Sequence, residues 1–187
     1  MTYFKKGSIK SAILVGLVTI FIAFTVGIGS EALLQFLSGF WIALVLLLII
    51  IFIGVGFDLI GTAVTAAEVG PFNARASKKV FGAAQAVRLL NHASSVANYC
   101  NDVIGDICGT LSGAIGASIV FKILLVFPLE NAALLSALVT AMVAGLTVGA
   151  KALGKSFAVA YANEIIFRVA VVLAVIEKKT RLTFFNN

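Results

Sequence analysis

Five polar residues lie within or beside long apolar stretches, where polar side chains usually face a partner or a cavity. Asp58 and Thr62 are four residues apart near the end of one such stretch, so a helix would place them on one face. Asp102 and Asp106 have the same spacing at the start of another stretch, directly after Asn101. Two predicted helices thus bring the polar side chains of Asp58, Thr62, Asn101, Asp102 and Asp106 to a similar depth.

A lysine at similar depth offers a second way to neutralise Asp58. Asp58 lies about 25 Å of helix beyond Trp41, and Lys151 lies about 28 Å beyond Ala132, at roughly 1.5 Å per residue. A carboxylate at the C-terminal end of a helix opposes the helix dipole, so Asp58 needs a cation, either a metal ion or Lys151. Simpler interpretations stay open, because Lys151 could extend to the membrane interface and Asp102 could be stabilised in the first turn of its helix.

The composition is that of an integral membrane protein. Of the 187 residues, 61% are hydrophobic and 12% are charged, and the mean hydropathy is +1.11. Soluble domains are about half apolar and about a quarter charged. The net charge of +6 indicates orientation by the positive-inside rule, and no basic, aromatic-lined surface points to nucleic acid. The expected partner is the lipid bilayer.

The apolar stretches predict an all-α fold with about four transmembrane helices and amphipathic helices beside them. A basic N-terminus and an additional transmembrane helix occupy 1–38, and the main transmembrane domain occupies 39–187. Within the main domain, 68–98 is amphipathic and basic, and 156–176 is expected to lie at the interface, although a fifth crossing there stays open. The predicted spans are 11–29, 39–67, 101–127 and 132–150.

The distribution of basic residues predicts how the chain is oriented. Four spans place both termini and the 68–98 segment on one side, which then holds 13 of the 14 Lys and Arg residues. That side is expected to be cytoplasmic, in the plasma (inner) membrane. We expect no enzyme activity, because His92 is the only histidine and no nucleophile motif is present.

Three phrases in the sequence resemble the transmembrane domain of the cyclin M / CorC family of magnesium transporters or exporters, over roughly 40–176. They are FDLIGTAVTAAE (57–68), AVRLLNHASSVANY (86–99) and CNDVIGDICG (100–109). The resemblance implies a homodimer with a magnesium (Mg2+) site among the helices, open to the cytoplasm. Hard cations such as Mg2+ prefer oxygen ligands, so the candidate metal ligands in this chain are Asp58, Thr62, Asn101, Asp102 and Asp106. The soluble regulatory modules of that family have no counterpart in this sequence.

The chain departs from the family pattern at the implied metal site. Positions that are serine, asparagine and glutamate in the family correspond here to Asp58, Asn101 and Lys151. A lysine among the ligands would repel Mg2+. One expectation is a protein that binds or transports Mg2+ through a site near the cytoplasmic side. The alternative is a non-transporting scaffold or subunit in which an Asp58–Lys151 ion pair replaces the metal. Contact within about 4 Å without a surrounding cage of oxygens favours the alternative.

Overall fold

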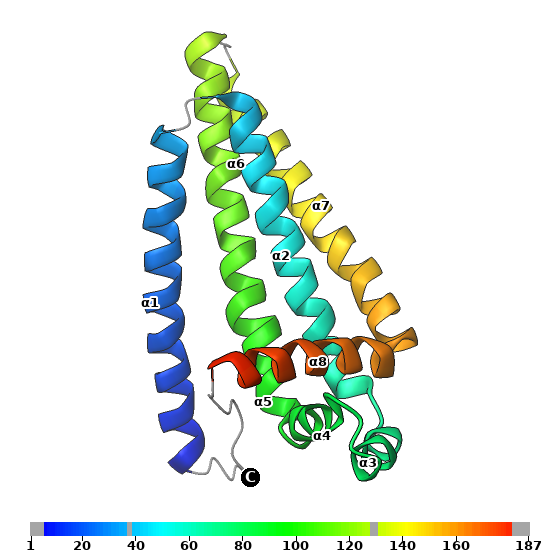
Figure 1. Ribbon diagram of the computed structural model, residues 1–187. Helices are drawn as coiled ribbons and strands as arrows, with labels where there is room; N and C mark the ends of the chain where they lie inside the picture. Colours follow the sequence, from blue (N-terminus) through cyan, green and yellow to red (C-terminus); the bar gives the residue numbers. More distant parts are fainter. Residues whose placement is uncertain (1–5, 37–38, 128–130, 181–187) are drawn as a thin grey trace, which may run out of the picture. The chain divides into compact units, whose positions relative to one another are not determined.

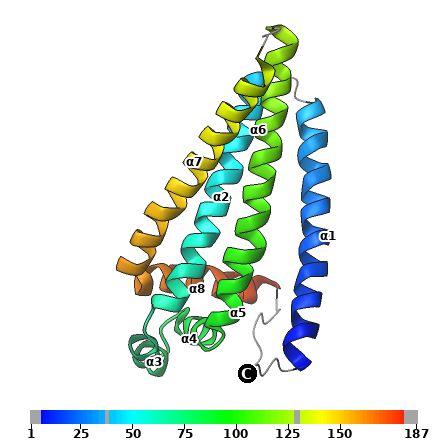
Figure 2. The ribbon, with the colours of Figure 1, turned by 180° about the vertical axis from the view of Figure 1, so that it is seen from behind.

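Helices are the only regular elements in the residues that the computed structural model describes, which are 6–36, 39–127 and 131–180 (Figures 1 and 2). The predicted all-α class is therefore confirmed for this part of the chain. In chain order the elements are α1 (Lys6–Phe36), α2 (Phe40–Ala66), α3 (Val69–Ser77), α4 (Ala83–Asn91), α5 (Ala93–Asn98), the π-helix η1 (Tyr99–Gly105), α6 (Asp106–Val126), α7 (Ala132–Ala160) and α8 (Ala162–Thr180).

Among the described residues, three helices are long and apolar enough to cross a membrane. They are α2, the continuous run Ala93–Val126 formed by α5, η1 and α6, and α7. The apolar part of α1, Ile13–Gly29, is shorter, so the crossing expected at 11–29 stays a prediction. The helices α3, α4 and α5 account for the segment expected to be amphipathic, but their placement at a membrane surface also stays a prediction.

One helix boundary differs from the sequence-based expectation. We expected a span to end at Ala150 and an interfacial helix over 156–176, whereas α7 continues to Ala160 and α8 begins at Ala162. Lysine has a high helix propensity, so Lys151 and Lys155 do not interrupt the helix. The chain turns only at Tyr161, whose carbonyl accepts a bond from the N–H of Glu164 at 3.1 Å.

The chain forms two compact units, and each is described separately. The first comprises Met1–Phe52 with Asp106–Gly145, and the second comprises Ile53–Gly105 with Leu146–Asn187. In the first unit, α1 packs on α6. Gly116 of α6 lies so close to α7 that an added Cβ would be 3.3 Å from Cγ2 of Val143. The predicted division at residue 38 stays a prediction.

The core of the second unit forms where α4 packs on α3 and on α8 (Figure 1). Phe72 and Ile166 are its largest fully buried side chains. At the edge, Arg88 of α4 forms an ion pair with Glu177 of α8 at 2.8 Å. The buried core residues are Ala63, Val64, Phe72, Ala86, Leu89, Leu90, Val96, Ala97, Cys100, Ala158, Ala162, Ile166 and Ala170.

A glycine at the start of α4 sets the distance between α4 and α8. Gly82 has φ +84°, a left-handed conformation that other residues rarely adopt. A Cβ at this position would lie 2.8 Å from Cγ2 and 3.0 Å from Cα of Val171. Any larger residue therefore has to strain its backbone and also push α8 away.

We predict that Gly82→Ala destabilises the protein by about 2–4 kcal/mol, the sum of left-handed backbone strain and overpacking. Thermal unfolding in detergent can be followed with a thiol-reactive fluorophore, because Cys100 and Cys108 are both buried. Gly70→Ala is the matched control, since nothing lies within 4 Å of its added Cβ. Equal unfolding temperatures for the two variants would contradict this account.

Candidate functional site

The candidate site is centred on Asp58, a carboxylate that the second unit buries almost completely. Asp58 is on α2 and is 4% exposed. Apart from Ser112, it is the only buried polar or charged residue among those whose burial is described. An isolated carboxylate in such an environment is costly, so it requires a positive partner or several hydrogen-bond donors. The groups around Asp58 therefore determine what the site can bind.

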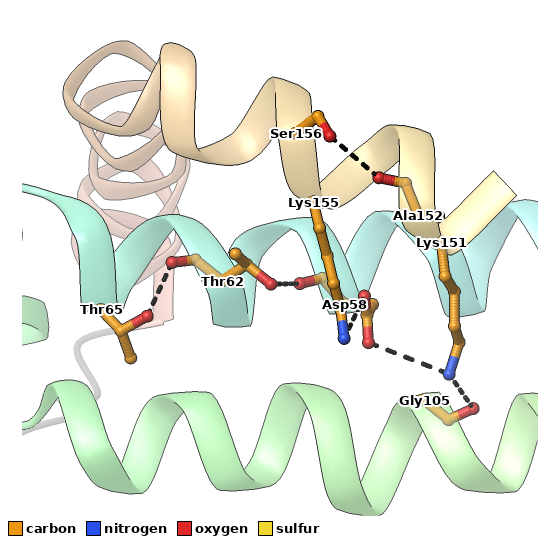
Figure 3. Close-up of polar contacts among 8 residues, drawn as sticks. All are labelled: Asp58, Thr62, Thr65, Gly105, Lys151, Ala152, Lys155 and Ser156. Carbon is orange, nitrogen blue, oxygen red and sulfur yellow. Dashed lines mark hydrogen bonds and ion pairs between the residues drawn. The ribbon is translucent and has the colours of Figure 1, made fainter. Parts of the chain in front are cut away.

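Two lysines of α7 reach toward this carboxylate (Figure 3). The Nζ of Lys151 is 3.9 Å from Oδ1 of Asp58, and the Nζ of Lys155 is 3.8 Å from Oδ2. Lys151 also donates a hydrogen bond of 3.4 Å to the carbonyl of Gly105 in η1. The separations from Asp58 are ion-pair distances, longer than the 2.7–3.2 Å range of direct N–H···O hydrogen bonds. We call Asp58, Lys151 and Lys155 the charge cluster, which has a formal charge of +1.

Lys155 is the member of the charge cluster that the sequence analysis missed. It follows Lys151 by four residues, so both side chains extend from the same face of α7. This spacing was a usable signal, but it depended on α7 continuing past Ala150. The side chain of Lys155 is 55% exposed and that of Lys151 is 21% exposed. The two lysine side chains that approach Asp58 therefore differ in how far the rest of the protein covers them.

A π-helix supplies the third side of the site. The η1 segment, Tyr99–Gly105, has the wider i→i+5 hydrogen-bonding pattern. Such turns often occur at functional sites. A Cβ at Gly105 would lie 3.4 Å from Nζ of Lys151 and 3.3 Å from the carbonyl oxygen of Cys100. Glycine at this position lets the ammonium approach the helix backbone closely.

Asn101, also in η1, packs directly against the backbone of α2. A Cβ added to Gly61 would lie 2.7 Å from Cγ of Asn101, so the amide occupies the space that a side chain at Gly61 would need. Oδ1 of Asn101 and Oδ2 of Asp58 are buried, and neither accepts a hydrogen bond from the described part of the chain. Two buried acceptor oxygens are thus left without donors.

The other predicted metal ligands, Thr62, Asp102 and Asp106, are not part of the charge cluster. The hydroxyl of Thr62 donates at 2.8 Å to the backbone carbonyl of Asp58, within its own helix. Asp102 and Asp106 are exposed. Among the described residues, no group of three or more histidine, cysteine, aspartate or glutamate side chains could hold a metal ion.

The groups around Asp58 do not match the ligand set that magnesium requires. Mg2+ takes six oxygen ligands in near-octahedral geometry and is bound mainly by carboxylates, phosphates and water. Asp58 itself offers one carboxylate, and the two ammonium groups 3.9 and 3.8 Å from its oxygens would repel a cation. The arrangement is suited to an ion pair between helices.

Comparisons with protein-family models, curated proteins and solved structures find no significant match to this chain. The resemblance to the cyclin M / CorC family therefore stays a prediction that rests on the three sequence phrases. What the site can do has to be argued from its own geometry.

We predict that Gly61→Ala destabilises the protein by about 1–3 kcal/mol, because the new methyl group overlaps the Asn101 amide. Asn101→Ala alone should be close to neutral, since it removes a buried oxygen that has no donor. The double variant should recover most of the stability lost in Gly61→Ala. Thermal unfolding of the four proteins forms a double-mutant cycle, and strictly additive effects would show that these residues are not in contact.

Proposed function

We propose that this chain is an integral membrane protein that acts as a non-transporting scaffold or subunit, in which the charge cluster stands in place of a metal site. The observation that carries the proposal is that Lys151 and Lys155 lie 3.9 and 3.8 Å from the two carboxylate oxygens of Asp58. The apolar lengths of α2, α5–α6 and α7 support the membrane assignment.

The charge cluster is well suited to holding helices together. It links α2 to α7, and the bond from Lys151 to the Gly105 carbonyl links α7 to η1. Interactions between helices in lipid depend on packing and on polar contacts, because the surrounding acyl chains are as apolar as the side chains. Removing one partner of a buried ion pair leaves the other charge uncompensated, which makes the contact specific for these helices.

A divalent-cation function is the second candidate, and one observation favours it. Among the described residues, Oδ2 of Asp58 and Oδ1 of Asn101 are buried acceptors without hydrogen-bond donors, and each is an oxygen that a cation could bind. The half-exposed Lys155 side chain has room to move away. On this proposal Mg2+ is the transported substrate, and the lysines leave the site when the ion enters.

The remaining sequence-based predictions belong to the proposal. We retain a homodimer, cytoplasmic termini and no enzyme activity. Added Cβ atoms at Gly109 and Gly113 of α6 would meet nothing within 4 Å, so this face of α6 has room for a second helix. Crosslinking in membranes that yields only monomer would remove the homodimer.

The two candidate functions predict different effects of substitution. If the cluster is a structural ion pair, Asp58→Asn should destabilise the protein by about 3–5 kcal/mol because it leaves the partly buried Lys151 without its counter-charge. Lys155→Gln should cost less than about 1 kcal/mol, because that side chain is half exposed. Thermal unfolding in detergent measures both. An Asp58→Asn variant as stable as wild type would show that the cluster does not hold the helices together.

Magnesium provides the second test. Wild-type protein should show no change in unfolding temperature with MgCl2 and no Mg2+ flux in proteoliposomes. The variant Lys151→Gln/Lys155→Gln removes both ammonium groups and exposes Asp58 to a cation, so Mg2+ should stabilise it by mass action. Stabilisation of wild type by Mg2+, with a flux that Asp58→Asn abolishes, would establish the cation function instead.

A further inference from the structure

A basic cavity lies in the second unit, between α3 and the first two turns of α8. Its volume is about 460 Å³, and it is lined by Arg75, Asn163, Glu164, Phe167 and Arg168. None of these residues belongs to the charge cluster or was singled out as a metal ligand. The cavity is an open hollow that has room for a phosphate group with a small substituent.

The cavity is located where two potential membrane-spanning helices end. α2 ends at Ala66, two residues before Glu68, and α7 ends at Ala160. The N–H of Glu68 donates a hydrogen bond of 2.9 Å to Oδ1 of Asn163, at the start of α8. This bond connects the segment that follows α2 with the helix that follows α7. Helices that leave the hydrocarbon at a common point place the residues just beyond it among the lipid headgroups.

The two arginines of the cavity are positioned to bind an anion. Arg75 is held in place by aromatic rings, with its guanidinium carbon 4.7 Å from the centre of Phe167 and 5.9 Å from that of Phe72. Arg168 is exposed. Within the described residues, no carboxylate forms an ion pair with either guanidinium, although Glu164 is only four residues from Arg168. Guanidinium groups bind phosphate oxygens through pairs of hydrogen bonds.

The carboxylate of Glu164 adds a second chemical requirement. Two arginines and one glutamate give the cavity a formal charge of +1, which complements a phosphodiester. A ligand that also carries an ammonium group would satisfy Glu164 at the same time. Phosphatidylethanolamine has both groups, whereas phosphatidylglycerol has the phosphate alone.

We propose that this cavity binds the headgroup of a phospholipid, with its phosphate on Arg75 and Arg168 and a headgroup amine on Glu164. The proposal rests on the membrane placement given under the proposed function, and it is independent of what the charge cluster binds. The headgroup would fix the junction between α7 and α8 at the surface of the bilayer.

Binding of dihexanoyl phosphatidylethanolamine to the full chain in detergent micelles tests the proposal by native mass spectrometry. Arg75→Gln and Arg168→Gln should each weaken binding by about fivefold, a typical contribution of one basic residue at a membrane surface. Lys178→Gln/Lys179→Gln is the control, because it removes two exposed charges outside the cavity. Glu164→Gln should reduce the preference for phosphatidylethanolamine over phosphatidylglycerol.

Three outcomes would overturn the proposal. The first is that Arg75→Gln and Arg168→Gln, shown to be folded by their thiol accessibility, bind the lipid as tightly as wild type does. The second is an unchanged headgroup preference in Glu164→Gln. The third is equal affinity for soluble glycerophosphoethanolamine, which would identify a site for free phosphate esters. None of these results depends on whether Mg2+ binds at Asp58. The phospholipid proposal and the proposal for the charge cluster can therefore fail separately.

Discussion

A carboxylate buried among helices has to be neutralised by groups on other helices, and in this chain that requirement constrains three elements at once. Asp58 on α2 requires α7 to present Lys151 and Lys155 on one face. It also requires η1 to bring a backbone carbonyl near Lys151, which glycine at position 105 permits. The charge cluster therefore constrains the register of the second unit's part of α7 relative to its part of α2.

Beyond the charge cluster, the second unit is organised by close contacts between short helices. α4 can pack against α8 because Gly82 has no side chain between them. A hydrogen bond from Glu68, just after α2, to Asn163 of α8 connects the segments that follow α2 and α7. These contacts hold the polar residues beyond the apolar helices in defined positions, which is a requirement for any specific headgroup or ion site.

The all-α class and the contact between Asp58 and Lys151 could be predicted from sequence, because they follow from apolar length and from the rise per residue. The π-helix could not be predicted, since its wider turn is stabilised by tertiary contacts and not by local propensity. Asp102 lies inside η1, so the four-residue spacing that suggested a common face with Asp106 does not apply there. Lys155 was missed because no glycine or proline marks where α7 ends, and helix boundaries depend on such signals.

The unequal exposure of the two lysines gives the charge cluster an inner and an outer contact. Mobile ions screen charges that are in contact with water over about 8–10 Å at physiological ionic strength, but they screen buried pairs much less. The attraction between Asp58 and the 55% exposed Lys155 is therefore the more salt-sensitive of the two, and that with Lys151 is the less sensitive. The link between α2 and α7 thus responds to the surrounding ions more strongly near Lys155 than near Lys151.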